Sequence, residues 1–345
     1  MSLYKLPAEW APQDAILLTW PHPATDWADS LAEVERVFLQ LAAAISQRQS
    51  LIVLCHNMFL LSRLQKILPE HQVQMQRTFL LQIPNNDSWA RDHGPITVYN
   101  QAGQAVWLNF EFTGWGQKFA ARLDNQINGH LFGVSIIQAI ALESVDLVLE
   151  GGAIETDGQG VLLANESCLL HANRNPQLRK EQLEQRLTEL FGIRKFLWLQ
   201  QPPLTGDDTD GHIDTLARFT PSGALLYVSC DDVKDPHFQP LTQLKSQLAA
   251  FTDRKGQPYP LLPLPWPAAK YDHQGNRLAA SYANYLLING AVLMPTYQDA
   301  ADSQAMAVIQ QAHPGYQIIG IDCLPLIRQG GSLHCVTMQL PRGVL

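Results

Sequence analysis

The sequence predicts one α/β domain made of five repeated units that are arranged radially. An order of apolar strand, turn, second strand, amphipathic helix and closing strand recurs along the chain. Five units in 345 residues average 69 residues each (345/5), which is longer than common solenoid repeats, and the copies share little sequence identity. This combination favours radial repetition over stacking. Because 46% of the residues are apolar, the chain can fill a large core, and we expect a single closed domain over residues 1–345.

The first two units are identified by short apolar runs that turn residues separate. The second unit contains the clearest reversal, an Asn-to-Gly segment at 100–103 between two apolar runs, which is typical of a hairpin turn. Apolar residues at helical spacing follow the first strand of the first unit. The elements expected here are strands at 14–20 and 50–55 around a helix at 31–46, then strands at 92–99, 105–110 and 134–137 with a short helix near 119–131.

The last three units show the same order with more marked turns and helices. Glycine stands with Asp, Pro or Asn in each of their turns, at 157–160, 221–223 and 289–290. The segment 176–190 is charged on one side and apolar on the other, as a surface helix is. The elements expected are strands at 147–155, 161–164 and 196–199 with a helix at 176–190, strands at 212–219 and 224–228 and a proline-rich stretch at 258–267 with a helix at 240–250, and strands at 282–288, 291–295 and 316–321 with a helix at 303–312.

Polar residues occupy one equivalent position in successive units, where the first strand of the central hairpin begins. They are Asp92, Glu150, His212 and Asn284, and Cys335 follows on the last returning strand. Their separations, 58, 62, 72 and 51 residues (150 − 92, 212 − 150, 284 − 212, 335 − 284), are comparable to the repeat length. Equivalent positions in a ring of units point to one centre, so we expect carboxylates, an imidazole and a thiol in a single pocket.

The cysteine stretch has two interpretations. Gly330 and Gly331 permit an unusual backbone path or close approach of a ligand, and the alternation that follows predicts a strand, with the thiol of Cys335 where the turn becomes that strand. A buried structural cysteine is the alternative, since free cysteine is among the most buried residue types. His212 and Asp214 are two residues apart on a predicted strand and would face the same side, as a base and a substrate anchor or as a surface hydrogen-bonded pair.

The carboxylates also have simpler explanations. Asp92 can pair with Arg91 or cap a turn. Glu150 follows the apolar run 147–149, where burial is expected, and a buried carboxylate requires a cationic partner. It is their coincidence at matching repeat positions that favours a site.

Composition narrows the classes of partner. The formal net charge is −8 and no run of Lys or Arg occurs, which disfavours nucleic acid and anionic membranes and suits a small cationic substrate. The five cysteines are odd in number and never paired as C-x-x-C, which disfavours a disulfide framework or a cysteine-rich zinc site. The N-terminus lacks a signal-peptide pattern and no apolar run is long enough to span a bilayer, so we expect a cytoplasmic protein. A homo-oligomer is compatible with the sequence.

No cofactor or metal is expected. Neither a phosphate-binding loop of the form G-x-x-x-x-G-K nor a strand-linked G-x-G-x-x-G occurs. Asp207, Asp208 and Asp210 precede His212 but lack the spacing and terminal Glu of a calcium loop. We interpret them as a solvated acidic loop.

Several motifs in order resemble one family. The chain is similar over nearly its full length to the agmatine deiminase branch of the guanidine-modifying (pentein) superfamily, which also includes bacterial-type peptidylarginine deiminases. The resemblance implies an α/β propeller of five ββαβ blades with pseudo-fivefold symmetry. The motifs that carry it are Pro7-Ala8-Glu9-Trp10 with Leu18-Thr19-Trp20-Pro21-His22, Trp89-Ala90-Arg91-Asp92-His93-Gly94-Pro95, Glu150-Gly151-Gly152, Asn173-Arg174-Asn175-Pro176, Gly211-His212-Ile213-Asp214, Ser281-Tyr282-Ala283-Asn284 and the cysteine stretch.

The resemblance also implies roles for the residues that match its motifs. Cys335 would be the nucleophile, His212 the general acid and base, Asp92 and Asp214 the carboxylates that hold a guanidinium, and Glu150 a further residue of the same pocket. Such carboxylates hold a planar cation by charge-assisted, often bidentate hydrogen bonds. From the residues themselves, we assign Asn284 to substrate binding and expect tryptophans to wall a narrow pocket, with Trp89 the first choice and Trp115 and Trp20 the others; buried core tryptophans are the alternative.

The function implied is hydrolysis of agmatine to N-carbamoylputrescine and ammonia through a covalent S-alkylthiouronium, as in putrescine biosynthesis. The stretch Gly330-Gly331-Ser332-Leu333-His334-Cys335 departs from the agmatine deiminase pattern of three glycines and Ile-His-Cys, which leaves peptidylarginine or free arginine as alternative substrates. A non-catalytic guanidine- or polyamine-binding protein is the alternative from another class, although binding alone requires carboxylates and no thiol.

Overall fold

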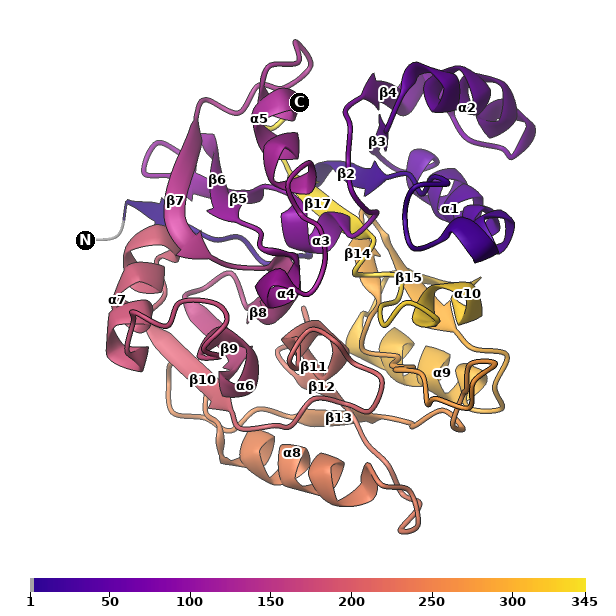
Figure 1. Ribbon diagram of the computed structural model, residues 1–345. Helices are drawn as coiled ribbons and strands as arrows, with labels where there is room; N and C mark the ends of the chain where they lie inside the picture. The colour runs from indigo at the N-terminus through magenta and orange to yellow at the C-terminus, as the bar shows by residue number, and fades with distance from the viewer. Residues whose placement is uncertain (1–2) are drawn as a thin grey trace.

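The structure is a computed structural model that describes residues 3–345. Its fold is mixed α/β, with five separate sheets of three or four strands that succeed one another around the molecule and helices at the periphery (Figure 1). The strands, in the order in which they pair, are β17 (Thr337–Pro341), β2 (Gln13–Thr19), β3 (Ser50–Cys55) and β4 (Thr78–Gln82); β1 (Tyr4–Lys5), β5 (Ile96–Asn100), β6 (Ala105–Glu111) and β7 (Leu142–Val148); β8 (Ile154–Thr156), β9 (Val161–Asn165) and β10 (Lys195–Leu199); β11 (Ala217–Phe219), β12 (Leu225–Val228) and β13 (Leu261–Leu264); β14 (Leu286–Ile288), β15 (Ala291–Thr296) and β16 (Gln317–Asp322).

Every sheet contains the same three-strand pattern. Two neighbouring strands are antiparallel, and the second of them pairs in parallel with the strand that follows, as in β5, β6 and β7 or in β14, β15 and β16. The same holds for β8 to β10, β11 to β13, and β17 with β2 and β3. A parallel connection needs a crossover, which a helix usually provides. The repeated order of two strands, helix and closing strand expected from the sequence is thus present in each sheet.

The longer helices connect the parallel strands, and most of the short helical segments lie in other connections of the chain. The crossover helices are α1 (Leu31–Ser46), α2 (Met58–Glu70), α5 (Ile127–Phe132), α7 (Lys180–Phe191), α8 (Phe238–Ala250) and α9 (Asp302–Ala312). The remaining helical segments are η1 (Ala28–Ser30), η2 (Met75–Arg77), α3 (Ala90–His93), α4 (Gly114–Gln117), η3 (Asp124–Gln126), η4 (Gly151–Ala153), α6 (Glu166–Leu169), η5 (Ile213–Thr215) and α10 (Leu324–Ile327).

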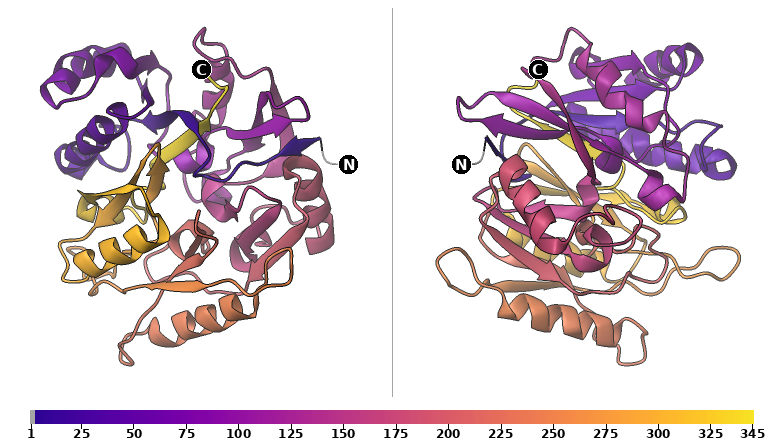
Figure 2. Two further views of the ribbon diagram at one scale, coloured as in Figure 1. Left: turned by 180° about the vertical axis from the view of Figure 1, so that it is seen from behind. Right: turned by 60° about the vertical axis from the view of Figure 1, so that its left-hand side comes forward.

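The first and last parts of the chain share one sheet. β17 pairs antiparallel with β2, and Thr337 lies opposite Leu18. Figure 2 shows the yellow β17 beside the indigo β2. Cys335 stands two residues before β17, so this pairing holds the C-terminal cysteine stretch against the beginning of the chain.

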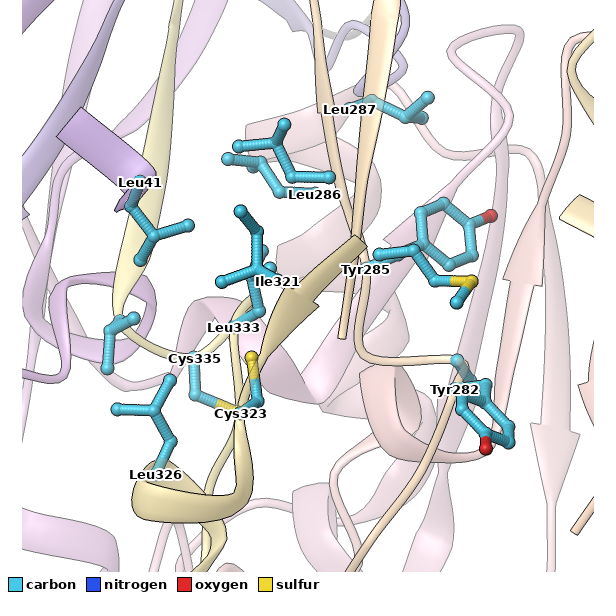
Figure 3. Close-up of a cluster of buried hydrophobic side chains, with 14 of the residues drawn as sticks. Leu41, Tyr282, Tyr285, Leu286, Leu287, Ile321, Cys323, Leu326, Leu333 and Cys335 are labelled. Atoms are coloured by element: carbon cyan, nitrogen blue, oxygen red, sulfur yellow. The ribbon is translucent and has the colours of Figure 1, made fainter. Parts of the chain in front are cut away.

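The crossover helices pack because their apolar residues recur at helical spacing. In α1, Val34, Phe38, Leu41 and Ile45 are fully buried, at intervals of three or four residues that place them on one face. Figure 3 shows Leu41 of this helix in a hydrophobic cluster with Leu286, Ile321 and Leu333, and Cys335 in the same cluster. The thiol therefore has the hydrophobic core behind it.

Several expectations about the strands were wrong. The segments 92–99 and 282–288 are strands only from Ile96 and Leu286 onward, because α3 and a turn precede those residues. The segment 134–137 forms bends and turns, and the closing strand of the second unit is β7, whose alternating burial marks a half-exposed strand. The run 147–155 is not one strand, because β7 ends at Val148 and η4 intervenes before β8. Short apolar runs do not reveal which of two adjacent sheets they join.

No helix of residues 3–345 combines the length and apolar character needed to cross a bilayer.

Candidate active site

Each of the five sheets places a short turn or helix at one common region, just before the first strand of its antiparallel pair. These segments are brief, so their side chains leave the sheet and point to the middle of the molecule instead of alternating across a strand face. The residues carried there are Asp92 in α3 before β5, Glu150 at the start of η4 before β8, His212 and Asp214 at η5 before β11, Asn284 before β14, and Cys335 before β17.

The local structure of three expected residues differs from the prediction. His212 and Asp214 do not lie on a strand, because η5 occupies Ile213–Thr215 and β11 begins only at Ala217. Cys335 lies in the turn before β17 and not on the strand itself. A single 3-10 turn carries no periodicity that a sequence pattern could reveal, so it is easily taken for the start of the strand that follows it.

Gly152 marks the point where three of these side chains converge. A Cβ atom at Gly152 would lie 2.5 Å from Nδ1 of His212, 3.0 Å from Oδ1 of Asp92 and 3.2 Å from Oδ2 of Asp214. The Gly152 N–H also donates a hydrogen bond to Oδ1 of Asp92 at 3.0 Å. An imidazole and a carboxylate expected from one unit, and a second carboxylate expected from another, therefore meet around one residue that has no side chain.

The thiol of Cys335 lies between an amide and a carboxylate. Nδ2 of Asn284 is 3.3 Å and Oδ1 of the same side chain 3.4 Å from Sγ. Oδ2 of Asp214 is 3.8 Å from Sγ. Asn284 also accepts a hydrogen bond from the His334 N–H at 2.9 Å, so it fixes the backbone next to the thiol as well as contacting the sulfur.

The imidazole of His212 is enclosed by carboxylates and is 1% exposed. Nδ1 lies 3.7 Å from Oδ1 of Asp92, and Nε2 lies 3.8 Å from Oε2 of Glu150. Neither ring nitrogen has a hydrogen-bond partner. Glu150 in turn accepts a hydrogen bond from Nε of Arg174 at 3.0 Å.

The two groups that could exchange protons have shifted pKa values. Burial, followed by the negative charges of Asp214 and Asp92, raises the pKa of the Cys335 thiol well above its usual range. For His212, burial opposes the charged form, but the charge of Asp92 and the contacts with Cys168 and Glu150 outweigh it, so the pKa of His212 is raised well above its usual value. Both shifts favour the protonated forms, the neutral thiol of Cys335 and the imidazolium of His212.

The pKa values of the two carboxyl groups are shifted in opposite directions. Burial disfavours ionisation of Asp214, but the hydrogen bond and charge of His334 overcome it and lower the pKa of Asp214. At Asp92, burial raises the pKa, and the nearby charges of Asp214 and Glu150 add to it against the opposing His212. A cation bound between Asp92 and Asp214 would favour the ionised form of both.

A charged network supports Asp214 through Oδ2, the carboxylate oxygen that also lies 3.8 Å from Sγ of Cys335. Nδ1 of His334 lies 2.7 Å from Oδ2 of Asp214, and Nε2 of His334 lies 2.8 Å from Oε2 of Glu9. Arg218 donates to Glu9 at 2.6 Å and to Glu155 at 2.9 Å, and its side chain is 1% exposed. The Pro7 to Trp10 motif therefore contributes Glu9 to the support of the site.

The mouth of the site is aromatic and acidic. Trp89 and Trp115 line the pocket that contains Cys335, and Nε1 of Trp115 donates to Oδ2 of Asp92 at 3.0 Å. Trp20, in contrast, packs against Phe38 in the core. The other lining residues are Asp26, Asp87, Asp92, Phe119, Asp208, Thr209, Gln329, Gly330 and Gly331.

Acidic groups at this mouth have raised pKa values in the free protein. Burial, together with the nearby charge of Asp207, raises the pKa of Asp208 to about 6. Burial and the charge of Asp26, against hydrogen bonds from Ser88 and Trp89, raise the pKa of Asp87 to about 6. At Asp208 the charges of Lys118 and His212 oppose this rise without overcoming it.

The sequence predicts no role for several residues of this region. Asp208 belongs to the expected solvated loop, yet it lines the pocket, while its neighbour Asp210 pairs with Lys118 and Arg174 at 2.8 Å each. Other residues without a predicted role that contact site residues or line the pocket are Glu9, Asp26, Asp87, Cys168, Arg174 and His334. The position of His334 next to Cys335 was the one available signal.

The chain matches known proteins along most of its length. The family model described as Porphyromonas-type peptidyl-arginine deiminase matches residues 5–341. A protein of Vibrio parahaemolyticus that is provisionally named an agmatine deiminase is 34% identical over 357 residues, which cover 98% of this chain and 97% of that protein.

Solved structures are similar over the same length. A structure from Porphyromonas gingivalis, provisionally named an arginine deiminase, is 45% identical with a TM-score of 0.92 and covers 99% of both chains. The C. jejuni agmatine deiminase, solved as a cysteine-to-serine variant with substrate bound, is 34% identical with a TM-score of 0.90 and covers 99% of this chain and 97% of that one.

The match spans all five sheets and every segment that brings a residue to the site. The resemblance inferred from the separated motifs is thereby confirmed. This chain belongs to the Porphyromonas-type peptidyl-arginine deiminase family.

Proposed function

We propose that this protein is a guanidine deiminase that hydrolyses agmatine to N-carbamoylputrescine and ammonia. N-carbamoylputrescine is the product that leads to putrescine. The observation that carries the proposal is the convergence of Cys335, His212, Asp92 and Asp214 around Gly152 and Asn284. A thiol, an imidazole and paired carboxylates are the groups that a covalent attack on a guanidinium carbon requires. Relatives named agmatine deiminase, at 28–34% identity, support the same reaction.

We further propose that the five sheets are the blades of one propeller with pseudo-fivefold symmetry, and that residues 1–345 form a single catalytic domain. The identical strand pattern of the five sheets supports this. The groups assigned to the reaction all come from one chain, so the proposed chemistry requires no second copy.

Binding places the guanidinium carbon beside the thiol. Asp92 and Asp214 grip the planar cation by charge-assisted hydrogen bonds. The cation adds positive charge next to Cys335, whose pKa is raised by burial and by those carboxylates, and so favours loss of the thiol proton to solvent. The thiolate is thus formed in the presence of substrate, when it has a carbon to attack.

The first half of the reaction expels ammonia. The sulfur of Cys335 bonds to the guanidinium carbon and gives a neutral tetrahedral adduct. The His212 imidazolium protonates one amino group, the C–N bond breaks, and ammonia leaves an S-alkylthiouronium cation. The raised pKa of His212 favours the charged form of the ring that this step requires, and Glu150 lies near Nε2 of the same ring. One general acid and base contributes typically about 10²–10⁴-fold.

The second half releases the ureido product. Neutral His212 takes a proton from water, and the hydroxide adds to the thiouronium carbon. The C–S bond then breaks and the sulfur leaves as thiolate, and the new hydroxyl group passes its proton to that thiolate, which restores the Cys335 thiol and gives the ureido group. His212 is again an imidazolium, so the site is ready for another substrate.

The acidic mouth favours agmatine over free arginine. Asp26, Asp87 and Asp208 line the pocket beyond the thiol, and agmatine carries an ammonium at the end opposite its guanidinium. The α-carboxylate of arginine would face these three carboxyls and be repelled. Trp89 and Trp115 fit the aliphatic chain between the two ends.

Free arginine and peptidylarginine form the second candidate. The family description names peptidyl-arginine, and the P. gingivalis structure at 45% identity carries a provisional arginine deiminase name. A non-catalytic guanidine-binding protein is the third candidate, although it would have no use for the thiol of Cys335.

Substrate turnover tests the proposal. Ammonia and ureido product are measured with agmatine, free arginine and a blocked peptidylarginine, each in the presence of a metal chelator. We expect kcat/KM to favour agmatine strongly. A preference for arginine or its peptide would support the same reaction but assign a different substrate. If none of the three compounds is turned over, the enzyme assignment is rejected.

A further inference from the structure

A second buried thiol lies against His212. Cys168 comes from α6, directly after β9, and is fully buried. One ligand atom each from Glu150, Cys168 and His212 lie within 4.8 Å of one another. The proposed reaction uses His212 and Glu150 but assigns nothing to the thiol of Cys168.

One polar atom in this cluster lacks a partner. Nε2 of His212 is buried without a hydrogen bond, whereas Oε1 of Glu150 lies 2.8 Å from Nε of Arg174 in an ion pair. Nearly all buried polar atoms in folded proteins are paired, so an unpaired ring nitrogen near a carboxylate and a thiol indicates that a further group can bind there. Glu150 lies near Nε2 of His212, whereas Asp92 lies near Nδ1. A group bound between Glu150 and Nε2 would therefore be on the opposite edge of the imidazole ring from Asp92.

The three ligand types are those of a zinc site. A thiolate, an imidazole and a carboxylate bind Zn²⁺ with bond lengths of roughly 2.0–2.3 Å, leaving the fourth tetrahedral position to water. Adjacent ligand atoms then lie roughly 3.5 Å apart, so the side chains would close by about 1 Å around the ion. The thiolate selects against Mg²⁺ and Ca²⁺, which prefer oxygen ligands.

The surroundings also suit a metal-bound imidazole. A histidine that binds zinc through one nitrogen commonly has a carboxylate near the other, and Oδ1 of Asp92 is 3.7 Å from Nδ1 of His212. Arg174 already neutralises part of the charge of Glu150, but it is itself paired with Asp210 at 2.8 Å. The negative charge of a Cys168 thiolate is thus left for the cation.

We propose that Glu150, Cys168 and His212 form a zinc site, and that zinc bound there stops catalysis. Binding displaces the proton of the Cys168 thiol and the Nε2 proton of the His212 imidazolium, and both protons pass to solvent. Zinc on Nε2 holds His212 in one orientation with its proton on Nδ1, so the ring no longer shuttles a proton. The ion lies behind the imidazole and away from the guanidinium position, so inhibition is not competitive with substrate.

The inhibition rests on the function proposed above, whereas the metal site does not. Zinc affinity is therefore measured first, without substrate, by competition with a chromophoric chelator. We expect one Zn²⁺ per chain for the wild type, for Cys335→Ser and for the equally buried control Cys55→Ser, and an affinity at least about 10-fold weaker for Cys168→Ser.

Cobalt shows which sulfur binds. Co²⁺ in a tetrahedral site with a thiolate gives a sulfur-to-metal charge-transfer band, which we expect in the wild type and in Cys335→Ser but not in Cys168→Ser. A band that persists in Cys168→Ser and disappears in Cys335→Ser would overturn the proposal by placing the metal on the nucleophile. If Cys168→Ser does not fold, Cys168→Ala provides the same comparison.

Turnover is measured last. We expect Zn²⁺ to lower kcat of the wild type reversibly, with recovery on adding a chelator, and to inhibit Cys168→Ser at least about 10-fold less effectively. Zinc that binds as described without lowering kcat would refute the inhibitory part alone. A protein inactive on every guanidine would leave the binding and cobalt results intact, so the failure of either proposal can be recognised.

Discussion

His334 holds Asp214, with Nδ1 of the imidazole 2.7 Å from Oδ2 of the carboxylate. The two residues are 120 positions apart in the chain, and His334 directly precedes Cys335. The other ring nitrogen contacts Glu9 at 2.8 Å. One histidine therefore links the N-terminal segment, Asp214 and the backbone next to Cys335.

His334→Gln tests this link. The amide cannot contact both carboxylates as the ring does, so Asp214 loses its orientation and the partner that lowers its pKa. We expect kcat/KM for agmatine to fall by about 10²-fold, with the change shared between kcat and KM. Steady-state kinetics measure it, and an unchanged near-ultraviolet dichroism spectrum shows that the fold is retained. Wild-type kinetics would rule out a positioning role for His334.

Cys335→Ser is expected to abolish turnover, with a loss of more than roughly 10⁴-fold in kcat. The hydroxyl of serine ionises far less readily than a thiol and cannot form the thiouronium intermediate. Cys230→Ser is the matched control, because Cys230 contacts the backbone of Asp232 far from the site. Substantial turnover by the serine variant would show that another group makes the covalent bond.

Gly152→Ala should misalign the site without a change of charge. Its methyl group would stand 2.5 Å from Nδ1 of His212 and 3.0 Å from Oδ1 of Asp92, which is closer than atoms in contact can approach. We expect kcat/KM to fall by about 10²-fold. Gly129→Ala in α5 is the control, since a Cβ there meets no atom within 4 Å. Equal activity of the two variants would show that the convergence around Gly152 is unimportant.

The affinity for agmatine should fall in mild acid. The raised pKa of Asp208, about 6, means that its carboxyl is protonated in the free protein below that pH and ionised above it. An ammonium group binds the ionised form, so KM for agmatine should rise as the pH falls through 6, while a substrate without a distal cation should show a smaller change.

Asp208→Asn identifies the source of that dependence. The variant should raise KM for agmatine at pH 8 and flatten the pH dependence of KM between pH 5 and 7, leaving the part due to Asp87, whose pKa is also raised to about 6. Initial rates over substrate concentration at each pH provide the measurement. An unchanged KM in Asp208→Asn would remove this residue from substrate recognition.

Alkylation rates should reveal how the thiol is activated. Burial and the nearby carboxylates raise the pKa of Cys335, so neutral iodoacetamide should react slowly at pH 7. A haloacetamidine carries a planar cation that Asp92 and Asp214 can bind, and it should react faster at Cys335 and be blocked by agmatine. Peptide mapping locates the label. Equal rates for the two reagents, or no protection by agmatine, would contradict activation by the bound cation.

Several residues of the site could be predicted because chemistry and spacing agreed. Asp92, Glu150, His212 and Asn284 recur at nearly the repeat length, and the structure places each just before the first strand of a sheet. Their local conformation was wrong at His212, since a single 3-10 turn has no sequence periodicity.

Other residues could not be predicted because their partners are distant in the chain. Glu9 and His334 are 325 residues apart, and Cys168 reaches His212 from an otherwise unremarked helix. Asp208 was placed in a solvated loop, because an acidic run looks the same whether its carboxyls face bulk water or the mouth of a pocket.

The sequence by itself determined the order of strands and helices and the chemical groups available, because apolar periodicity and side-chain type are local properties. Which groups meet was decided by the tertiary structure alone. Five sheets pack so that turns from 92 to 335 face one another, and a buried thiol, imidazole and carboxylate acquire their shifted pKa values only through that packing. Distances of three to four ångströms between residues more than a hundred positions apart follow from packing, which no local pattern encodes.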